Sequence, residues 1–267
     1  DATVIPSEHF DAVTYTGNDS DNEIDGLNFQ PDWVWIKRRD DTDHHMLFDS
    51  LRGFNDDGDS LHIKISEDSN QESHDDDQHL KSFDSDGFTV QGSDSETNAD
   101  TSTYVAWNWK IADTASGTTT GSGTGKAYSA QYNTDAGISL IKYTGNGTAG
   151  HTIPHHLGAT PDMVWTTRRD AGANYMAVFA GNLSSMGNNY LQPSTNEAVT
   201  THSVFFNNTV PSSTVFTVGT ASGNNTNDGD HFAYCFRSID GYSKVGSYTG
   251  NGDADGAFVY TGFRVRW

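Results

Sequence analysis

The chain has 267 residues, enough for one large domain or two ordinary ones. Aromatic residues make up 12% and recur at regular spacing, which argues against disorder. The formal net charge is −21: residues 1–116 hold 27 acidic and seven basic residues, whereas residues 117–267 hold nine and eight. This acidity disfavours nucleic acid as a partner and suits a cation-binding surface. No apolar run approaches the roughly 20 residues of a membrane-spanning helix, so no membrane insertion is expected.

The first predicted unit covers residues 1–112 and is typical of short strands joined by polar turns. In one of these strands Trp33 and Trp35 face one way, whereas Val34 and Ile36 face the other. A strand that is apolar on both faces should be central and covered on both sides. The many acidic side chains of this unit are expected on its solvent face.

Residues 113–135 are predicted to be a linker. The stretch from Thr114 to Gly125 reads TASGTTTGSGTG and contains no charge and no apolar side chain larger than alanine. This composition is typical of a flexible connection between domains.

The second predicted unit, residues 136–247, repeats the first. Pro31-Asp32-Trp33-Val34-Trp35 recurs as Pro161-Asp162-Met163-Val164-Trp165, and Phe88-Thr89-Val90 recurs as Phe216-Thr217-Val218. The same order at a near-constant offset indicates two copies of one module. The pattern has a period of two and nowhere sustains a helical period. It therefore predicts an all-β fold of two tandem homologous antiparallel β-sandwich modules, of jelly-roll or concanavalin-like type.

The last stretch, residues 248–267, repeats the opening of a module with Tyr248-Thr249-Gly250-Asn251. An isolated opening would leave backbone groups and aromatic side chains uncovered, which is costly. It can close the second module's sheet, add a strand to a neighbouring copy, or lead into a longer chain. We favour a neighbour or a continuing chain. The side chains expected to lose surface to another subunit are Phe258, Tyr260, Phe263 and Trp267.

The motifs together resemble a known family. YTGNG, LGATPDMVW, GFTV, YVAWNWK and GYSKVGSYTGNG are similar to a repeat domain of unknown function in structural proteins of marine bacteriophages, especially cyanophages. The resemblance spans nearly the whole chain. It implies a tail fibre or another virion appendage, a virion-surface or extracellular location, and a role in assembly or host contact. It implies no catalytic residues.

Tryptophans are the candidate ligand-binding residues. Trp33, Trp35 and Trp165 would stack on sugar rings if one face of each indole were exposed. Their strand spacing equally fits core positions, so the alternative is that they pack inside the modules.

Acidic loops are the candidate metal sites. Asp56, Asp57 and Asp59 stand on a turn, where carboxylate oxygens suit Ca²⁺. The alternative is a solvated acidic face, and no other cofactor is expected. His151, His155 and His156 lack the spacing of a closed zinc site and are expected in solvated loops.

Two arginines are expected to form ion pairs at corresponding places in the two units. The pairs Arg38-Arg39 and Arg168-Arg169 are each followed by an aspartate, Asp40 or Asp170. One arginine of each pair is expected to form a salt bridge with that aspartate or with the aspartate that follows the proline, Asp32 or Asp162.

No recognised nucleophile elbow, phosphate loop or zinc-protease motif occurs, so the protein is not expected to be an enzyme. The expected function is a structural or adhesive module of a virion appendage. Its expected partners are other copies of itself, other virion proteins or host-surface glycans. The alternative is a carbohydrate-binding module or a polysaccharide hydrolase domain. Buried tryptophans between the two units would favour the structural function over the alternative.

Overall fold

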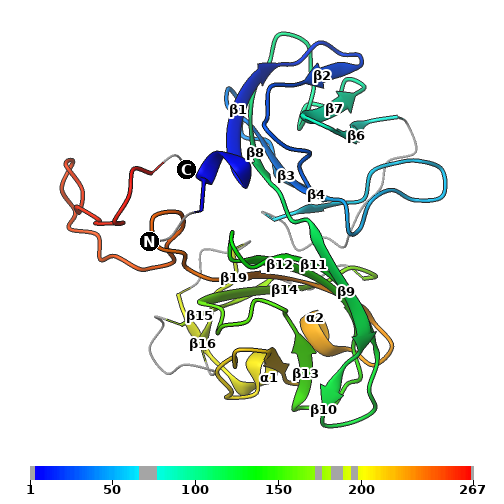
Figure 1. The fold of residues 1–267 in the computed structure, drawn as a ribbon, viewed down its shortest axis with the longest axis vertical. Helices are drawn as coiled ribbons and strands as arrows, with labels where there is room; N and C mark the ends of the chain where they lie inside the picture. Colours follow the sequence, from blue (N-terminus) through cyan, green and yellow to red (C-terminus); the bar gives the residue numbers. More distant parts are fainter. Residues whose placement is uncertain (1–3, 66–76, 172–175, 182–188, 194–197, 266–267) are drawn as a thin grey trace.

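A computed structural model describes residues 4–65, 77–171, 176–181, 189–193 and 198–265. It shows two β-sandwiches, one stacked on the other (Figure 1). The helices described are short: η1 (Pro6–Glu8), α1 (Ser203–Phe206) and α2 (Ser222–Asn225). Among the described residues, no helix has the length and apolar character needed to cross a bilayer. The predicted all-β class with antiparallel sandwiches is confirmed.

The first sandwich packs a five-stranded sheet, in the order β1-β8-β3-β4-β5, against a three-stranded sheet, β2-β7-β6. Their bounds are β1 Phe10–Thr16, β2 Asn22–Ile24, β3 Trp33–Arg38, β4 His45–Asp49, β5 His62–Lys64, β6 His79–Asp84, β7 Gly87–Gln91 and β8 Thr103–Trp109. Val34 and Ile36 of β3 are fully buried between these sheets, with Phe48 and Phe88. Because side chains alternate along β3, Val34 and Ile36 both point into this core.

The second sandwich has a six-stranded sheet, β15-β14-β19-β12-β11-β9, and a three-stranded sheet, β10-β13-β18. Their bounds are β9 Asp113–Thr118, β10 Thr120–Gly121, β11 Ala127–Asn133, β12 Ile138–Thr144, β13 His151–Pro154, β14 Met163–Arg168, β15 Ala177–Ala180, β18 Val215–Val218 and β19 Asp230–Phe236. A separate pair is formed by β16 (Asn189–Tyr190) and β17 (Thr200–Thr201). Ile141, Phe179 and Phe216 belong to the core of this sandwich.

The two sandwiches share a strand order. The run β1-β8-β3-β4 in the first corresponds to β12-β19-β14-β15 in the second. Tyr15 stacks on Tyr104 at a ring-centroid distance of 5.0 Å, and Tyr143 stacks on His231 in the same way at 5.3 Å. This correspondence is what two copies of one module would produce. A strand-for-strand superposition of residues 8–112 on 136–244 remains a prediction.

A third core lies between the large sheets of the two sandwiches. Trp33 and Trp35 project into it from β3, on the face opposite Val34 and Ile36, and meet residues of the second sandwich. Trp35 and Trp165 contact edge to face at 6.1 Å between ring centroids. The strand that was predicted to be covered on both faces is therefore covered by its own sandwich on one face and by the other sandwich on the second.

The prediction of a flexible linker at residues 113–135 is wrong. Most of this stretch is strand: β9 pairs with β11, and β11 pairs with the edge of β12. Ala130 of β11 is buried in the second core. Backbone hydrogen bonding to an existing sheet edge needs no apolar side chains, so the composition concealed these strands.

Candidate interaction site at the C-terminal arm

Residues 246–265, here called the C-terminal arm, contain no strand in the described part of the chain. Closure of the second module's own sheet by residues 248–267 is therefore not seen in the part described, whereas strand addition to a neighbouring copy stays a prediction; Trp267 lies outside the described residues. Figure 1 shows the arm in orange and red, extending away from both sandwiches. Three of its aromatic side chains face solvent: Phe258 is 90% exposed, Tyr260 74% and Tyr248 72%.

The base of the arm is held against the body. Ile239 and Ser243 form an antiparallel bridge just before it. Lys244 Nζ donates to the carbonyl oxygen of Tyr260 at 3.4 Å and lies 5.9 Å from the centre of its ring. Phe263, one of the side chains expected to face a neighbouring subunit, is half-buried and lines a cavity of its own chain. The arm is thus held against the body near both of its ends, while the side chains of Phe258 and Tyr260 stay exposed.

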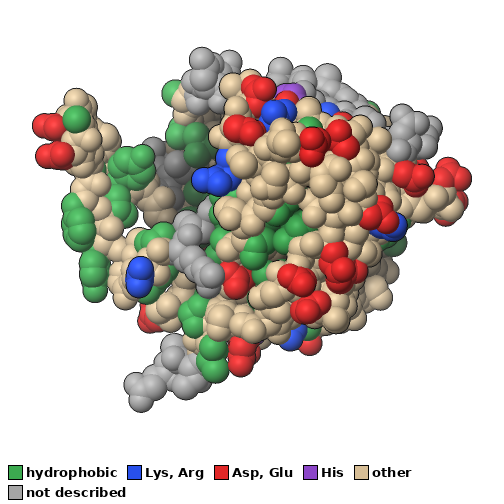
Figure 2. Space-filling model, turned by 90° about the horizontal axis from the view of Figure 1, so that it is seen from above, with side chains coloured by type: hydrophobic (Ala, Val, Ile, Leu, Met, Phe, Trp, Pro, Cys, Tyr) green, Lys and Arg blue, Asp and Glu red, His purple; other side chains and the backbone are tan. Residues whose placement is uncertain are grey.

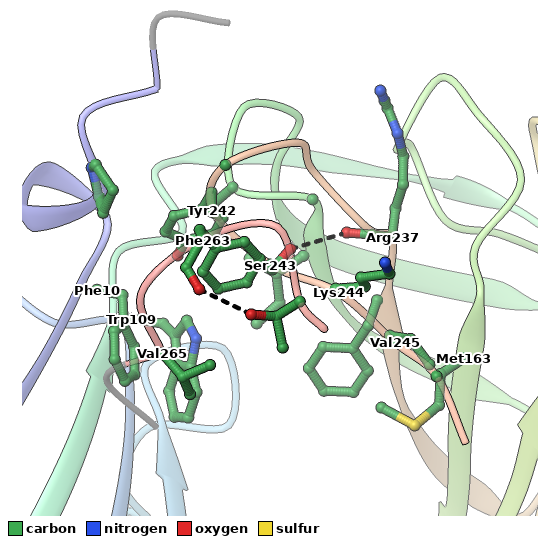
Figure 3. Close-up of a pocket in the computed structure, with 18 of the residues that line it drawn as sticks. Phe10, Trp109, Met163, Arg237, Tyr242, Ser243, Lys244, Val245, Phe263 and Val265 are labelled. Carbon is green, nitrogen blue, oxygen red and sulfur yellow. Dashed lines mark hydrogen bonds between the residues drawn. The ribbon is translucent and has the colours of Figure 1, made fainter. Parts of the chain in front are cut away.

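The cavity beneath the arm has a volume of about 420 Å³. Figure 3 shows Phe10 and Trp109 of the first sandwich on one side and Met163 of the second on the other, with Tyr242 and Phe263 between them. Its charged lining residues are Arg237, Lys244 and Arg264, and no acidic residue lines it within the described ranges. Phe263 packs into this apolar opening, so the cavity anchors the base of the arm.

The tryptophans proposed as a sugar platform do not form one. Trp33 is 0% exposed, and Trp35 and Trp165 are each 8% exposed, because all three lie in the core between the sandwiches. A sugar ring needs an open indole face, which the packing of the two sheets removes. Their alternation along the strand is typical of buried positions, but it does not show which layer covers them.

The proposed calcium loop is held by its own hydrogen bonds. Asn55 Oδ1 accepts hydrogen bonds from the backbone N–H groups of Asp57 and Asp59, and the Asp59 carboxylate accepts from Asn55 Nδ2 at 2.9 Å. Asp56 and Asp57 are exposed, whereas Asp59 is buried. These three carboxylates do not converge into a metal-binding group among the described residues. They form a polar turn, two of whose three carboxylates face solvent.

A different group brings ligand-type atoms together. Within the described residues, His79, Asp94 and Glu96 place one candidate ligand atom each within 4.8 Å of the others. Lys64 Nζ lies 3.1 Å from Glu96 Oε1, so the lysine ammonium group already offsets the negative charge of this carboxylate. Burial raises the pKa of Glu96, and the lysine opposes that shift. No spacing signal in the sequence indicates this group, because His79 begins β6, whereas Asp94 and Glu96 lie in the loop between β7 and β8.

Acidic side chains are spread over the first sandwich. Figure 2 looks down on this sandwich and shows many of them on the visible surface, as expected. Asp19, Asp25, Asp57 and Asp100 are among those exposed to solvent.

The expected ion pairs of the two arginine motifs are confirmed. Arg38 Nε lies 2.8 Å from Asp40 Oδ1, and Arg168 Nε lies 2.5 Å from Asp170 Oδ1. The hydrogen bond from Arg38 holds the pKa of the Asp40 carboxyl below its usual range. Both pairs are partly solvated. Each joins the end of a strand, β3 or β14, to the turn that follows it, so we assign them a structural role and not a ligand-binding one.

The expectation of solvated histidines is wrong for His151 and His155, which are fully buried. His231 of β19, which stacks on Tyr143, is fully buried as well. Burial lowers the pKa of His231 to about 4, because the imidazolium form loses its hydration. These histidines are part of the packing between and beneath the sheets.

We expect the stability of the chain to fall in acid between about pH 6.5 and pH 4. The unfolded chain takes up a proton at His231 near pH 6.5, whereas the folded chain resists it until the pH approaches about 4. Stability is therefore full above about pH 6.5 and is lost as the pH falls, by about 3 kcal/mol for this one histidine. Denaturation midpoints measured from pH 7 to pH 4 should decline less steeply for His231→Gln than for the wild type. The exposed His202, changed to Asn, is the control and should leave the slope as it is. Equal slopes for all three proteins would contradict the assignment.

These features define a class: an all-β protein of two sandwiches with a shared aromatic interface and an exposed aromatic arm. The chain belongs to a family described as a domain of unknown function (DUF7483), whose sequence model matches residues 5–267. Comparisons with curated proteins and with solved structures gave no match.

Proposed function

We propose that this chain is a structural module of a virion surface appendage, such as a tail fibre, that assembles with neighbouring subunits through its C-terminal arm and takes part in host attachment. The virion location rests on the resemblance of the sequence motifs to phage structural proteins. The assembly role rests on one observation: the arm holds Phe258 at 90% and Tyr260 at 74% exposure, on an excursion that is anchored at both ends. Large aromatic side chains concentrated on one exposed segment mark an interaction site.

The burial of the tryptophans supports this function over a sugar-binding one. The aromatic rings that would stack on glycans instead join the two sandwiches. The proposal includes no catalytic activity, since the sequence contains no recognised nucleophile elbow, phosphate loop or zinc-protease motif.

Self-association tests the proposal. We expect the wild-type chain to sediment as species larger than a monomer, with a distribution that depends on concentration. Changing Phe258 and Tyr260 together to Ser removes the aromatic anchors and should return the chain to a monomer with an unchanged melting temperature. Sedimentation velocity at several concentrations measures this.

The control is Val210→Ser, which changes an exposed apolar residue away from the arm and should leave the association as it is. A wild-type chain that stays monomeric at all concentrations, or a Ser variant that associates as before, would remove the basis for the assembly role.

A further inference from the structure

The outer edge of β1 is the counterpart of an edge that the second sandwich covers. In the second sandwich β12 is followed in the sheet by β11 and then by β9. In the first sandwich β1 holds the place of β12 but ends the sheet, with no strand beyond it among the described residues. An uncovered strand edge is a template for pairing with another chain.

The two edges differ in burial. Ile141 and Tyr143 of β12 are 0% and 3% exposed. Val13 and Tyr15 of β1 stand at the matching places and are only half-buried. The residues are similar in kind, so the missing neighbouring strand accounts for the difference.

The backbone of β1 is oriented to accept a strand. His9 O accepts from Lys110 N, and Gly17 N donates to Ser102 O, at the two ends of the β1–β8 ladder. Antiparallel residues alternate between bonding to the partner and pointing away, so even-numbered residues such as Ala12 and Thr14 direct their N–H and C=O groups outward. Asp11 Oδ1 accepts from the N–H of Ala12 at 2.7 Å, a local bond that a docking strand would replace.

The C-terminal arm has the sequence of such a strand. Residues 256–262 read GAFVYTG, without a charge and with aromatic and β-branched residues at the centre. The strand that covers β12 in the second sandwich is also uncharged, and it places Tyr128 beside Tyr143 in the ladder. An uncharged segment suits the strongly acidic first sandwich, because it brings no further negative charge to it.

We propose that the outer edge of β1 receives the segment Ala257–Tyr260 from a second copy of this chain, as an added antiparallel strand. The arm extends away from its own sandwiches, which places the segment within reach of another molecule (Figure 1). The donor and acceptor surfaces differ, so repetition of the contact links copies head to tail unless two copies exchange arms reciprocally. This inference rests on the proposed assembly role and names the surface that receives the arm.

The first test blocks the edge in the full chain. Thr14→Pro removes an N–H group that points away from β8, a position where an edge strand tolerates proline. We expect association at least about tenfold weaker in sedimentation velocity, consistent with the loss of one or two backbone hydrogen bonds. Thr14→Val keeps the N–H group and should associate like the wild type. A folded Thr14→Pro chain that associates normally would overturn the proposal.

The second test does not depend on tolerance of proline. Chains with Thr14→Cys are mixed with chains that carry Cys at Phe258, Val259 or Tyr260 in turn, under mild oxidation; the native Cys235 is buried. We expect a disulfide between the two chains for at least one of the three positions. Asp57→Cys, on an exposed turn of the same sandwich, should give none. Absence of any Thr14-specific cross-link would contradict the proposal even if Thr14→Pro fails to fold.

The two proposals can fail separately. If the Ser variants of the arm are monomeric while Thr14→Pro associates normally, the arm assembles the protein but binds elsewhere. If the arm variants associate like the wild type, the assembly role itself fails.

Discussion

Replacing Trp33 with alanine is expected to destabilise the whole chain by about 3–5 kcal/mol, the range for a large aromatic lost from a packed core. Trp33 is fully buried and stacks on Trp109 at 4.1 Å between ring centroids. It also lies 5.1 Å from Tyr234 and 5.9 Å from Phe236, which belong to the second sandwich. The substitution therefore opens a cavity between the two large sheets.

Denaturant unfolding followed by tryptophan fluorescence and by circular dichroism measures this cost. Because the sandwiches share a core, we expect the two signals to report one transition in the wild type. The matched control is Phe258→Ala, which removes an aromatic ring that is 90% exposed and should change stability by less than about 0.5 kcal/mol. A cost below about 1 kcal/mol for Trp33→Ala would mean that the interface contributes little.

Replacing Arg52 with methionine is expected to cost about 3–5 kcal/mol, because it leaves a buried carboxylate without its cation. The side chains of Arg52 and Asp49 are both fully buried, and Arg52 Nε lies 2.5 Å from Asp49 Oδ2. The guanidinium also donates to Leu47 O at 2.8 Å and to Tyr234 Oη at 3.2 Å. It lies 5.1 Å from the centre of the Phe232 ring. An arginine of the first sandwich thus completes the interface with the second.

Two variants separate the buried charge from other effects. Arg38→Met breaks partly solvated pairs with Asp40 and Asp43 and should cost much less than Arg52→Met, because solvent screens these charges. The double variant Asp49→Leu with Arg52→Met removes both buried charges and should recover much of the loss. If Arg52→Met costs no more than Arg38→Met, burial does not govern this pair.

Much of the fold could be predicted from the sequence. Alternation shows which residues of a strand share a face, so Trp33 and Trp35 on one face and Val34 and Ile36 on the other indicate a strand that is covered on both sides. The absence of a helical period indicates an all-β class. The sequence also predicted ion pairs for the arginine motifs, but it left two aspartates open as partners, and the structure shows Arg38 paired with Asp40 and Arg168 with Asp170.

Only the tertiary structure decided what covers each face and each edge. Periodicity indicates that a tryptophan is buried but does not identify the layer above it, so the sequence leaves Trp35 and Trp165 open to a sugar-binding interpretation that the packing of the two sheets removes. Strand β11 forms because the edge of β12 offers backbone partners, which side-chain composition does not reveal. The same reason applies to β1: its sequence resembles that of β12, but its uncovered edge depends on which segments of the chain reach it.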